Sequence, residues 1–415
     1  MKIEGRHWTC IALAALGLAQ VGSVFAQASP YYVGVAQAFT NESNVFRVAT
    51  GIPESSDTYS TTSLLAGINQ PFGRQRFFTD AVVRYNRYRE NTQLDNTGYG
   101  LAAGLDWETV ERLSGRIGYT LNENLARFGA DAGPPLTTKN MERSQEFVAS
   151  GQYGRISLLS LEAAYTHRQL DYSAAEWAYL EYKQDAISLG VLYRPSEQLT
   201  LGAATRHTEG RYPFAVETTP GVFQEDKFTR NDFDLTADWV ATGFSTVAVR
   251  LSFTRESHDV VTSRDINGPT GAVRWDYKPT GKLAFTTQFI HDSGPESSFT
   301  RYDQGGAKSI GSDSQISNSV LFRGLYEATA KVQIEFNARY ERRNLVNSFE
   351  LSTGGTSTET GSDELGEMRL GVNYAPTRSL LFGCALGYEK RATSSSLSYP
   401  YTAGIANCSA QFKLQ

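Results

Sequence analysis

The chain has 415 residues, with 39 Lys and Arg against 44 Asp and Glu, a formal net charge of -5, 12% aromatic residues and 37 glycines. This negative balance argues against nucleic acid as a partner, because proteins that bind nucleic acid neutralise phosphates with clustered Lys and Arg. Beyond the N-terminal stretch, no segment approaches the roughly 18 to 20 continuous apolar residues of a membrane-spanning helix, which argues against a helical inner-membrane protein.

The N-terminal residues have the features of a secretory signal peptide. Lys2 and Arg6 precede an apolar stretch from Ile11 to Val24, and Val24-Phe25-Ala26 has the small residues of a cleavage site. We therefore expect residues 1–26 to be a signal peptide and the mature chain to begin near Gln27.

Eight runs follow in which apolar residues alternate with small or polar ones and end on an aromatic residue near a short turn. The runs are 64–72, 99–107, 147–153, 187–193, 233–239, 273–277, 320–326 and 368–374. Because successive side chains of a strand point to opposite faces, each run predicts a strand with one apolar and one polar face. The repeated aromatic residue is typical of the belts of outer-membrane barrels, whose apolar face contacts lipid.

Alternation and turn residues together predict about 18 antiparallel strands, with about 16 as the alternative. The expected strands are approximately 31–48, 58–70, 75–90, 95–107, 112–122, 141–153, 156–170, 177–193, 198–211, 227–240, 244–257, 266–277, 282–292, 313–326, 331–345, 363–374, 379–391 and 400–414. Short turns alternate with long polar connections at 122–140, 212–225, 292–311 and 347–362. The predicted fold class is all-β: a transmembrane antiparallel up-and-down barrel in the cell outer membrane, with short periplasmic turns and long extracellular loops. We expect residues 27–415 to form this outer-membrane β-barrel as a single domain. A soluble β-propeller has a similar repeat length, but it needs four short strands per repeat.

Charged residues occupy many of the positions that alternate with the lipid-facing ones, and they are candidates for lining a channel. These candidates are Arg84, Arg116, Arg206, Asp234, Arg250, Arg274, Asp276, Arg323, Glu335, Arg339, Glu367 and Arg369. One interpretation is an arginine ladder that passes or holds anionic sugars. The other is a set of salt bridges between adjacent strands, which the interleaved acidic residues favour. A barrel of roughly 16 to 18 strands is wide enough to hold an aqueous channel.

The sequence offers no catalytic or metal-binding motif. His167, His207, His258 and His291 are scattered without metal-ligand spacing, so we expect no metal and no cofactor. His291 and Ser293 share one face of a strand, but no third polar group that would orient the base can be assigned. No nucleophile elbow, phosphate loop or dinucleotide fingerprint occurs in a fitting context. We therefore predict that the protein is not an enzyme.

Two cysteines, Cys384 and Cys408, lie on the last two predicted strands, equidistant from a loop centred near residue 396. A symmetric hairpin would make them a cross-strand pair, and the periplasm is oxidising enough to join them. A disulfide is one interpretation of this pair. Two small apolar side chains on a lipid-facing stripe are the other.

Several stretches resemble the exosortase-associated exopolysaccharide biosynthesis outer-membrane protein family, of EpsL type. They are Tyr31–Val48 (YYVGVAQAFTNESNVFRV), Ser55–Phe77, Asn96–Trp107 and Ser188–Tyr212. The resemblance covers most of the chain after the signal and rests on the combined order of these motifs. It implies a barrel that is encoded with polysaccharide-synthesis machinery and serves secretion of the polymer, and it supplies no catalytic or binding residues. The chain ends Phe412-Lys413-Leu414-Gln415, whereas barrels commonly end on an aromatic residue that the insertion machinery reads.

The residues and this resemblance together predict a porin-like outer-membrane channel that takes part in exopolysaccharide export. A general diffusion porin and a non-conducting barrel that scaffolds a polysaccharide secretion complex are the alternatives. Expected partners are outer-membrane lipid, the barrel-insertion machinery, exopolysaccharide and other secretion components, and an oligomer such as a trimer stays open. A wide lumen would support a channel, whereas inward-folded loops such as 122–140 would favour gating or scaffolding.

Overall fold

A computed structural model of the chain describes residues 29–110, 112–129, 137–154, 157–219, 222–292, 314–350, 356–395 and 397–414. The expected signal peptide, residues 1–26, lies outside these described residues. In the part of the chain that is described, no helix is long and apolar enough to cross a bilayer.

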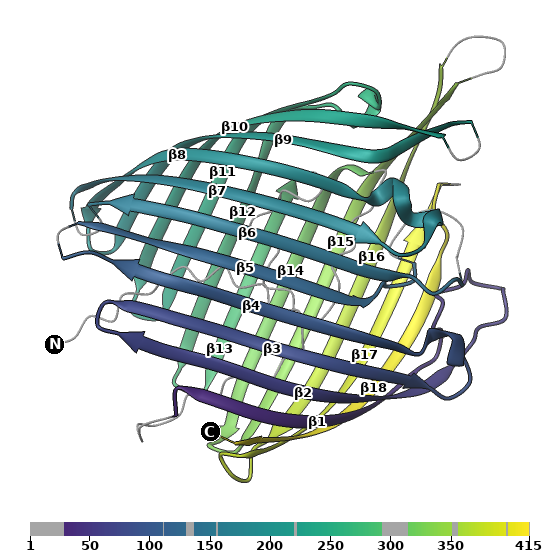
Figure 1. Cartoon of the computed structure of the whole chain (residues 1–415), viewed down its shortest axis with the longest axis horizontal. Coiled ribbons are helices and arrows are strands. Elements are labelled where there is room, and N and C mark those ends of the chain that lie inside the picture. Colours follow the sequence, from purple (N-terminus) through teal and green to yellow (C-terminus); the bar gives the residue numbers. More distant parts are fainter. Residues whose placement is uncertain are drawn as a thin grey trace.

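Eighteen antiparallel strands form one closed barrel within the described residues (Figure 1). Each strand pairs with its neighbours in sequence and β18 pairs with β1, so the sheet has no free edge. The strands are β1 Tyr31–Glu42, β2 Asp57–Phe72, β3 Gln75–Tyr88, β4 Asn96–Glu108, β5 Leu113–Leu125, β6 Met141–Tyr153, β7 Leu159–Tyr172, β8 Tyr182–Ser196, β9 Leu199–Thr219, β10 Val222–Thr242, β11 Ser245–His258, β12 Ile266–Thr280, β13 Leu283–Asp292, β14 Ser314–Thr329, β15 Val332–Glu350, β16 Thr356–Tyr374, β17 Leu380–Thr393 and β18 Tyr401–Leu414. In the described connections, short 3-10 helices lie at η1 Thr92–Leu94, η2 Ala175–Leu180 and η3 Thr262–Arg264. The predicted all-β up-and-down barrel is confirmed, with the higher of the two strand counts.

The alternation of residue types decides which face of each strand points outward. On β8, Ile187, Leu189 and Val191 are large apolar side chains exposed on the outside, whereas Gln184 and Ala186 on the same strand are buried on the inner face. A water-soluble protein would bury an apolar surface that recurs on strand after strand. A closed sheet satisfies every backbone hydrogen bond internally, so this surface can lie in hydrocarbon.

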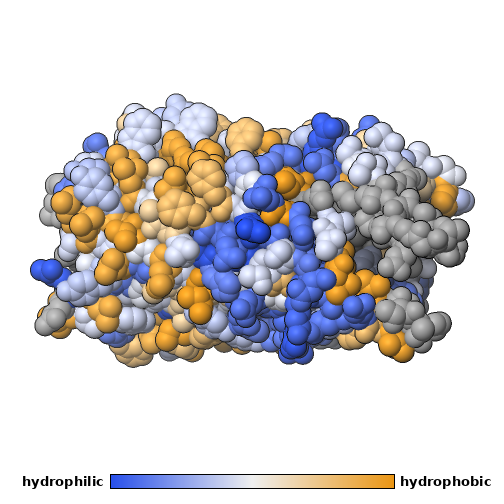
Figure 2. Space-filling model, turned by 90° about the horizontal axis from the view of Figure 1, so that it is seen from above, coloured by the Kyte–Doolittle hydropathy of each residue, from blue (hydrophilic) through white to orange (hydrophobic). Residues whose placement is uncertain are grey.

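The outer face changes from apolar to polar along the strands. Aromatic residues are exposed near the rim of short turns, which is the periplasmic rim in outer-membrane barrels: Phe72, Tyr153, Tyr193, Trp239, Tyr326 and Tyr374. Toward the opposite rim, polar side chains follow the apolar runs of β8 to β11: Asp185, His207, Asn231 and Arg255. Figure 2 shows this change, with apolar surface gathered toward the left of the view and a hydrophilic zone across its middle. The strands are therefore longer than the lipid band and project beyond it.

Several element limits differ from the predicted ones. The first strand ends at Glu42 and not at residue 48, because the apolar residues that follow it fold into the barrel. The expected loops 212–225 and 347–362 are largely strand, since β9 and β10 reach Thr219 and Val222, and β15 and β16 reach Glu350 and Thr356. Beyond the lipid both faces of a strand meet water, so the alternation that marks a strand is lost. Most of the expected loop 292–311 lies outside the described residues.

A tyrosine braces the seam that closes the barrel. Tyr32 on β1 reaches across β2, and its hydroxyl donates to Asp80 Oδ1 on β3 at 2.6 Å. Gly67 on β2 makes room for the ring, because a Cβ at that position would lie 2.3 Å from Tyr32 Cε1. Lys413 Nζ on β18 lies 3.7 Å from the centre of the same ring. The side chain of Tyr32 therefore links β1 to β2 and β3 on one side of the seam and to β18 on the other.

Candidate functional site

The twelve charged candidates lie on the strand faces opposite to the lipid-facing residues. They come from nine strands: Arg84 on β3, Arg116 on β5, Arg206 on β9, Asp234 on β10, Arg250 on β11, Arg274 and Asp276 on β12, Arg323 on β14, Glu335 and Arg339 on β15, and Glu367 and Arg369 on β16. Most of them lie in three groups, along β9 to β13, along β14 to β16 and at the mouth, whereas Arg84 and Arg116 lie apart on β3 and β5.

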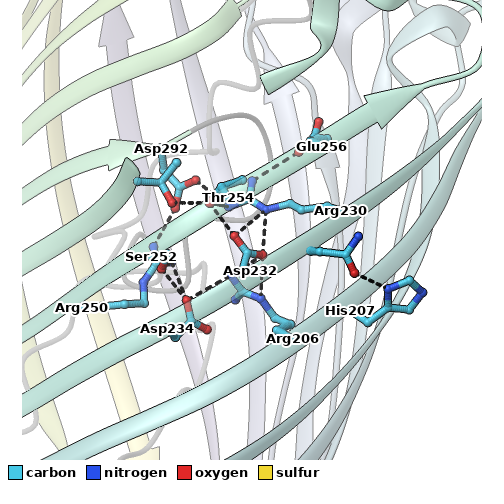
Figure 3. Close-up of polar contacts among 12 residues, drawn as sticks. Arg206, His207, Arg230, Asp232, Asp234, Arg250, Ser252, Thr254, Glu256 and Asp292 are labelled. Carbon is cyan, nitrogen blue, oxygen red and sulfur yellow. Dashed lines mark hydrogen bonds and ion pairs between the residues drawn. The ribbon is translucent and has the colours of Figure 1, made fainter. Parts of the chain in front are cut away.

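The first group, here called the β9–β13 network, joins Arg206, Arg230, Asp232, Asp234, Arg250 and Asp292 (Figure 3). Arg230 is its centre: the side chain has no exposed surface, and it lies 2.9 Å from Asp232 and 3.0 Å from Asp292. Arg206 reaches Asp232 from the neighbouring strand at 2.9 Å, and Arg250 reaches Asp292 at 2.6 Å.

Hydroxyl groups complete this network. Thr254 donates to Asp232 Oδ1 at 2.5 Å, and Ser252 donates to Asp234. In Figure 3, His207 points to the other side of the sheet, where its ring contacts Asn231 on the outer face. The arginines of this wall are therefore held by carboxylates, as the interpretation of mutual salt bridges expects. A buried pair of this kind leaves an uncompensated charge when one partner is removed.

Two connections fold inward at the rim opposite to the short turns. Phe46, which follows β1, packs edge-on against Phe128, which follows β5, with 5.0 Å between ring centres. These rings form one buried apolar cluster with Val45, Tyr88 and Leu94. Going around the barrel from β5 to β17, one passes β4, β3, β2, β1 and β18. The segment after β5 nevertheless contacts β16 and β17, so it crosses the inside of the mouth.

Ion pairs fix these inward segments to the wall, and we call them the mouth brace: Arg47, Arg127, Glu367, Glu389 and Arg391. Arg127 lies 2.5 Å from Glu367 and 2.7 Å from Glu389. Arg47 lies 3.4 Å from Glu389. Arg391 donates to the backbone carbonyl of Gly129. The brace therefore joins two loops to strands β16 and β17. Arg47, Glu389 and Arg391 are buried, whereas Arg127 and Glu367 are partly exposed.

Electrostatics keep both loop arginines charged. Burial opposes the charge of Arg47, but Glu42 and Glu389 raise the pKa of this guanidinium above its usual value. Burial also opposes the charge of Arg127, and Glu367 and Glu389 raise its pKa well above the usual range. Gly129 has a φ of +70° and approaches closely, because a Cβ there would lie 2.8 Å from the Cβ of Arg47. The lack of a side chain at Gly129 therefore lets the segment after β5 approach the segment after β1 closely.

Arg369 differs from the other arginines of the lumen. Its side chain is exposed on the inner face of β16, and no residue of the described part of the chain binds its guanidinium through a hydrogen bond or ion pair. Asn337 lies directly opposite it on β15, and Arg323 lies opposite Asn337 on β14. Arg323 is partly exposed and contacts Glu335 at 3.1 Å. This row offers cationic and amide donors toward the interior, which suits carboxylate, sulfate or phosphate groups and sugar hydroxyls.

The remaining candidates are held by local partners. Arg116 contacts Asp106 at 2.5 Å, Arg274 contacts Asp276 at 2.9 Å, and Arg339 contacts Glu341 at 2.8 Å. Arg84 is buried and donates to Asn124 Oδ1 at 3.2 Å. These contacts lie on β3 to β5, on β12 and on β15, and they line the inner wall with polar groups.

The twelve channel-lining candidates leave out several residues that organise this interior: Arg47, Arg127, Arg230, Asp232, Asp292, Glu389 and Arg391. Arg230 and Asp232 alternate with the candidate Asp234 on one strand, so the same period of two could have identified them. Arg47 and Arg127 lie in loops, where no period applies. Their only signal is a single cation beside apolar residues, Val45-Phe46-Arg47 and Arg127-Phe128.

Cys384 and Cys408 lie directly opposite each other on β17 and β18, and a disulfide joins them. Both residues are on the outer, lipid-facing side of the last hairpin. The disulfide therefore lies away from the lumen. It joins the two strands of the last hairpin and is not part of a transport path. His291, the candidate base, contacts Asn318 at 2.7 Å on the outer face, and Ser293 lies outside the described residues.

No family model and no curated protein matched the sequence, so membership of the exopolysaccharide family stays a prediction. Among solved structures, the chain is similar to the outer-membrane protein OpdK of Pseudomonas aeruginosa at 14% identity, covering 92% of this chain and 99% of that one, with a TM-score of 0.47. It is similar to OccK5 (OpdH) of the same organism at 12% identity, covering 94% and 100%, with a TM-score of 0.44. It is also similar to OccK2 (OpdF), solved in complex with glucuronate, at 14% identity, covering 92% and 98%, with a TM-score of 0.46.

The protein is an outer-membrane barrel of porin-like architecture. Its own closed sheet, lipid-facing exterior and charged interior establish this. The interior of the barrel combines a wall of mutually paired charges, an exposed cationic row and a mouth crossed by two braced loops. Such an arrangement can hold a polar path through the membrane and narrow it at one end.

Proposed function

We propose that the barrel is a channel with a narrowed mouth that takes part in exopolysaccharide export across the outer membrane. The observation that carries the proposal is the mouth brace, in which Arg127 of the segment after β5 pairs with Glu367 and Glu389 on the far wall. A narrowed mouth that can open suits a polymer path, because a permanently open pore wide enough for the polymer would also leak small solutes. A narrowed mouth is also compatible with a general diffusion porin, so the conductance test below separates the two.

The lining supports a hydroxyl-rich cargo. The inner wall combines guanidinium, carboxylate, amide and hydroxyl groups in alternation, as in the β9–β13 network and in the row of Arg323, Asn337 and Arg369. A hydrated polysaccharide can exchange hydrogen bonds with such a wall at every step. The sequence resemblance to an exopolysaccharide biosynthesis family favours a polysaccharide over other polar cargo.

The test is the conductance of the purified barrel in planar bilayers, with and without the polymer of the source cell. We expect low conductance for the native barrel, higher conductance for Arg127→Gln, and block of the enlarged current by the polymer. A large, steady current in the native barrel that the polymer leaves unchanged would make it a general diffusion porin.

A deletion strain tests the cellular role. We expect the polymer to be absent outside the cell while its synthesis continues. Undiminished secretion would refute the export role. Lost secretion that is restored by a variant with no conductance would instead identify a scaffold, which is the third interpretation.

A further inference from the structure

We propose that two copies of this chain associate in the membrane through the outer face of β1 and β2, with Gln37 at the centre of the contact. The two strands lie side by side with β18 at the lower edge of the barrel in Figure 1. This inference concerns the lipid-facing surface and does not depend on what the lumen carries.

Gln37 is an amide among lipid-facing apolar residues. On β1 it shares the outer face with Val33 and Val35 toward one rim and with Phe39 toward the other, and these three side chains are 60%, 49% and 60% exposed. A polar side chain at such a position is costly in hydrocarbon unless a partner satisfies its hydrogen bonds.

The pairing register places Gln37 well inside the lipid band. Directly opposite residues form the row Phe382 on β17, Ala410 on β18, Gln37 on β1, Thr62 on β2 and Tyr85 on β3. Phe382 lies near the short-turn end of its strand, whereas Tyr85 lies near the opposite end of β3. Because the strands of a barrel are tilted, this row climbs from one aromatic boundary toward the other. Gln37 lies at its middle.

The hydrogen bonds of Gln37 are incomplete within the barrel. Its carbonyl accepts from the hydroxyl of Thr62 at 2.7 Å. Its amide nitrogen has one long contact, 3.4 Å to the backbone carbonyl of Ala38, among the described residues. Contacts of that length are weak. The amide therefore retains donor capacity that lipid cannot satisfy.

A second copy of the chain satisfies it best. A primary amide is both donor and acceptor, so a two-fold axis beside Gln37 would place each amide against the carbonyl of its copy. On neighbouring β18 the outer face next to Gln37 carries small residues: Ala410 lies opposite Gln37, and Cys408, joined to Cys384, and Ala406 follow along the strand. Small side chains let two sheets approach closely.

The test compares Gln37→Leu with native full-length barrel in detergent, using light scattering after size exclusion to measure mass against concentration. We expect a dimer for the native barrel and a dimer dissociation constant about tenfold higher for Gln37→Leu, because a two-fold axis loses two hydrogen bonds at once. Heat-modifiable migration on gels reports folding of each variant, and Leu at a lipid-facing position leaves the barrel intact. Thr287→Val, on the outer face of distant β13, is the matched control and should leave the constant unchanged.

Cysteine cross-linking tests which outer face of the barrel forms the contact between two copies. Gln37→Cys should cross-link to itself in membranes on oxidation, whereas Thr287→Cys should not, and the native pair at Cys384 and Cys408 is the background. A native barrel that stays monomeric at every concentration, or equal cross-linking at both positions, would overturn the proposal. Cross-linking of Gln37→Cys to a different protein would also overturn it, since the face would then belong to that partner.

Discussion

Replacing Arg127 by Gln should open the mouth of the barrel. The guanidinium is the only group that joins the segment after β5 to both Glu367 and Glu389, at 2.5 and 2.7 Å, among the described residues. Removing one partner of a buried ion pair typically costs about 3 to 5 kcal/mol, because the remaining charge stays buried. Glu389 keeps a contact to Arg47 at 3.4 Å, so the lower end of that range applies.

If the inward position of this segment is destabilised by about 3 kcal/mol, the ratio of molecules with the segment inward to molecules with the segment displaced falls roughly 100-fold. We therefore expect Arg127→Gln to raise the time-averaged single-channel conductance and its fluctuations in planar bilayers. Arg342→Gln is the matched control, because it removes the same charge from the outer face of β15. Equal conductance of native barrel, Arg127→Gln and Arg342→Gln would refute the idea that the brace narrows the path.

Three further outcomes are expected. Arg230→Met leaves Asp232, Glu256 and Asp292 without their shared cation, so it should lower the free energy of unfolding by about 3 to 5 kcal/mol in urea titrations. Lys227→Met removes an exposed cation and should change this free energy little. Equal stability of both variants would show that the wall does not need Arg230. Arg369→Glu should shift the reversal potential in a salt gradient toward cation selectivity, with Arg369→Gln in between, and an unchanged potential would remove this residue from the path. Without a reducing agent, an alkylating reagent should leave Cys384 and Cys408 unmodified. Cys384→Ser should lower the free energy of unfolding by about 3 kcal/mol, because the disulfide closes a loop of 24 residues. Full alkylation of the native protein would show two free thiols and contradict the disulfide.

The sequence predicts the membrane-embedded part of this barrel well, for a physical reason. Between the aromatic rows one face of each strand meets hydrocarbon, so a polar residue there is costly and the alternation stays regular, as in Ile187, Leu189 and Val191 on β8. The same period places Arg250 and Asp234 on the inner face. Strand existence, direction and sidedness all follow from that single constraint.

Prediction fails where the constraint ends. Above the lipid both faces of β9 and β10 are wet, so their outer ends have the composition of a loop, and residues 212–225 were expected to be one. In the opposite case, Val45 and Phe46 have the composition of a strand but fold inward, because they are buried against Phe128 from another loop. Contacts between two loops have no period in the sequence.

The division of the inner residues into paired and free charges also depends on tertiary geometry. Arg250 and Arg369 occupy equivalent positions in their alternating patterns, yet Arg250 is buried against Asp292 and Arg369 is exposed. The difference arises from Asp292, which lies at the end of β13, two strands away from β11. A sequence shows that both arginines face inward, whereas only the register shows which one keeps a free guanidinium.

One pair of adjacent residues tests most directly whether the inner face lines a water-filled path while the outer face contacts lipid. Arg369→Cys and Leu370→Cys place a thiol on opposite faces of β16 one residue apart. We expect a charged, water-soluble thiol reagent to modify Arg369→Cys and reduce the current in planar bilayers. The same reagent should leave Leu370→Cys unmodified, and a fluorophore at residue 370 should be quenched by lipid-embedded quenchers. Equal modification of both residues, or modification of Leu370→Cys alone, would contradict the barrel's polar interior and lipid-facing exterior.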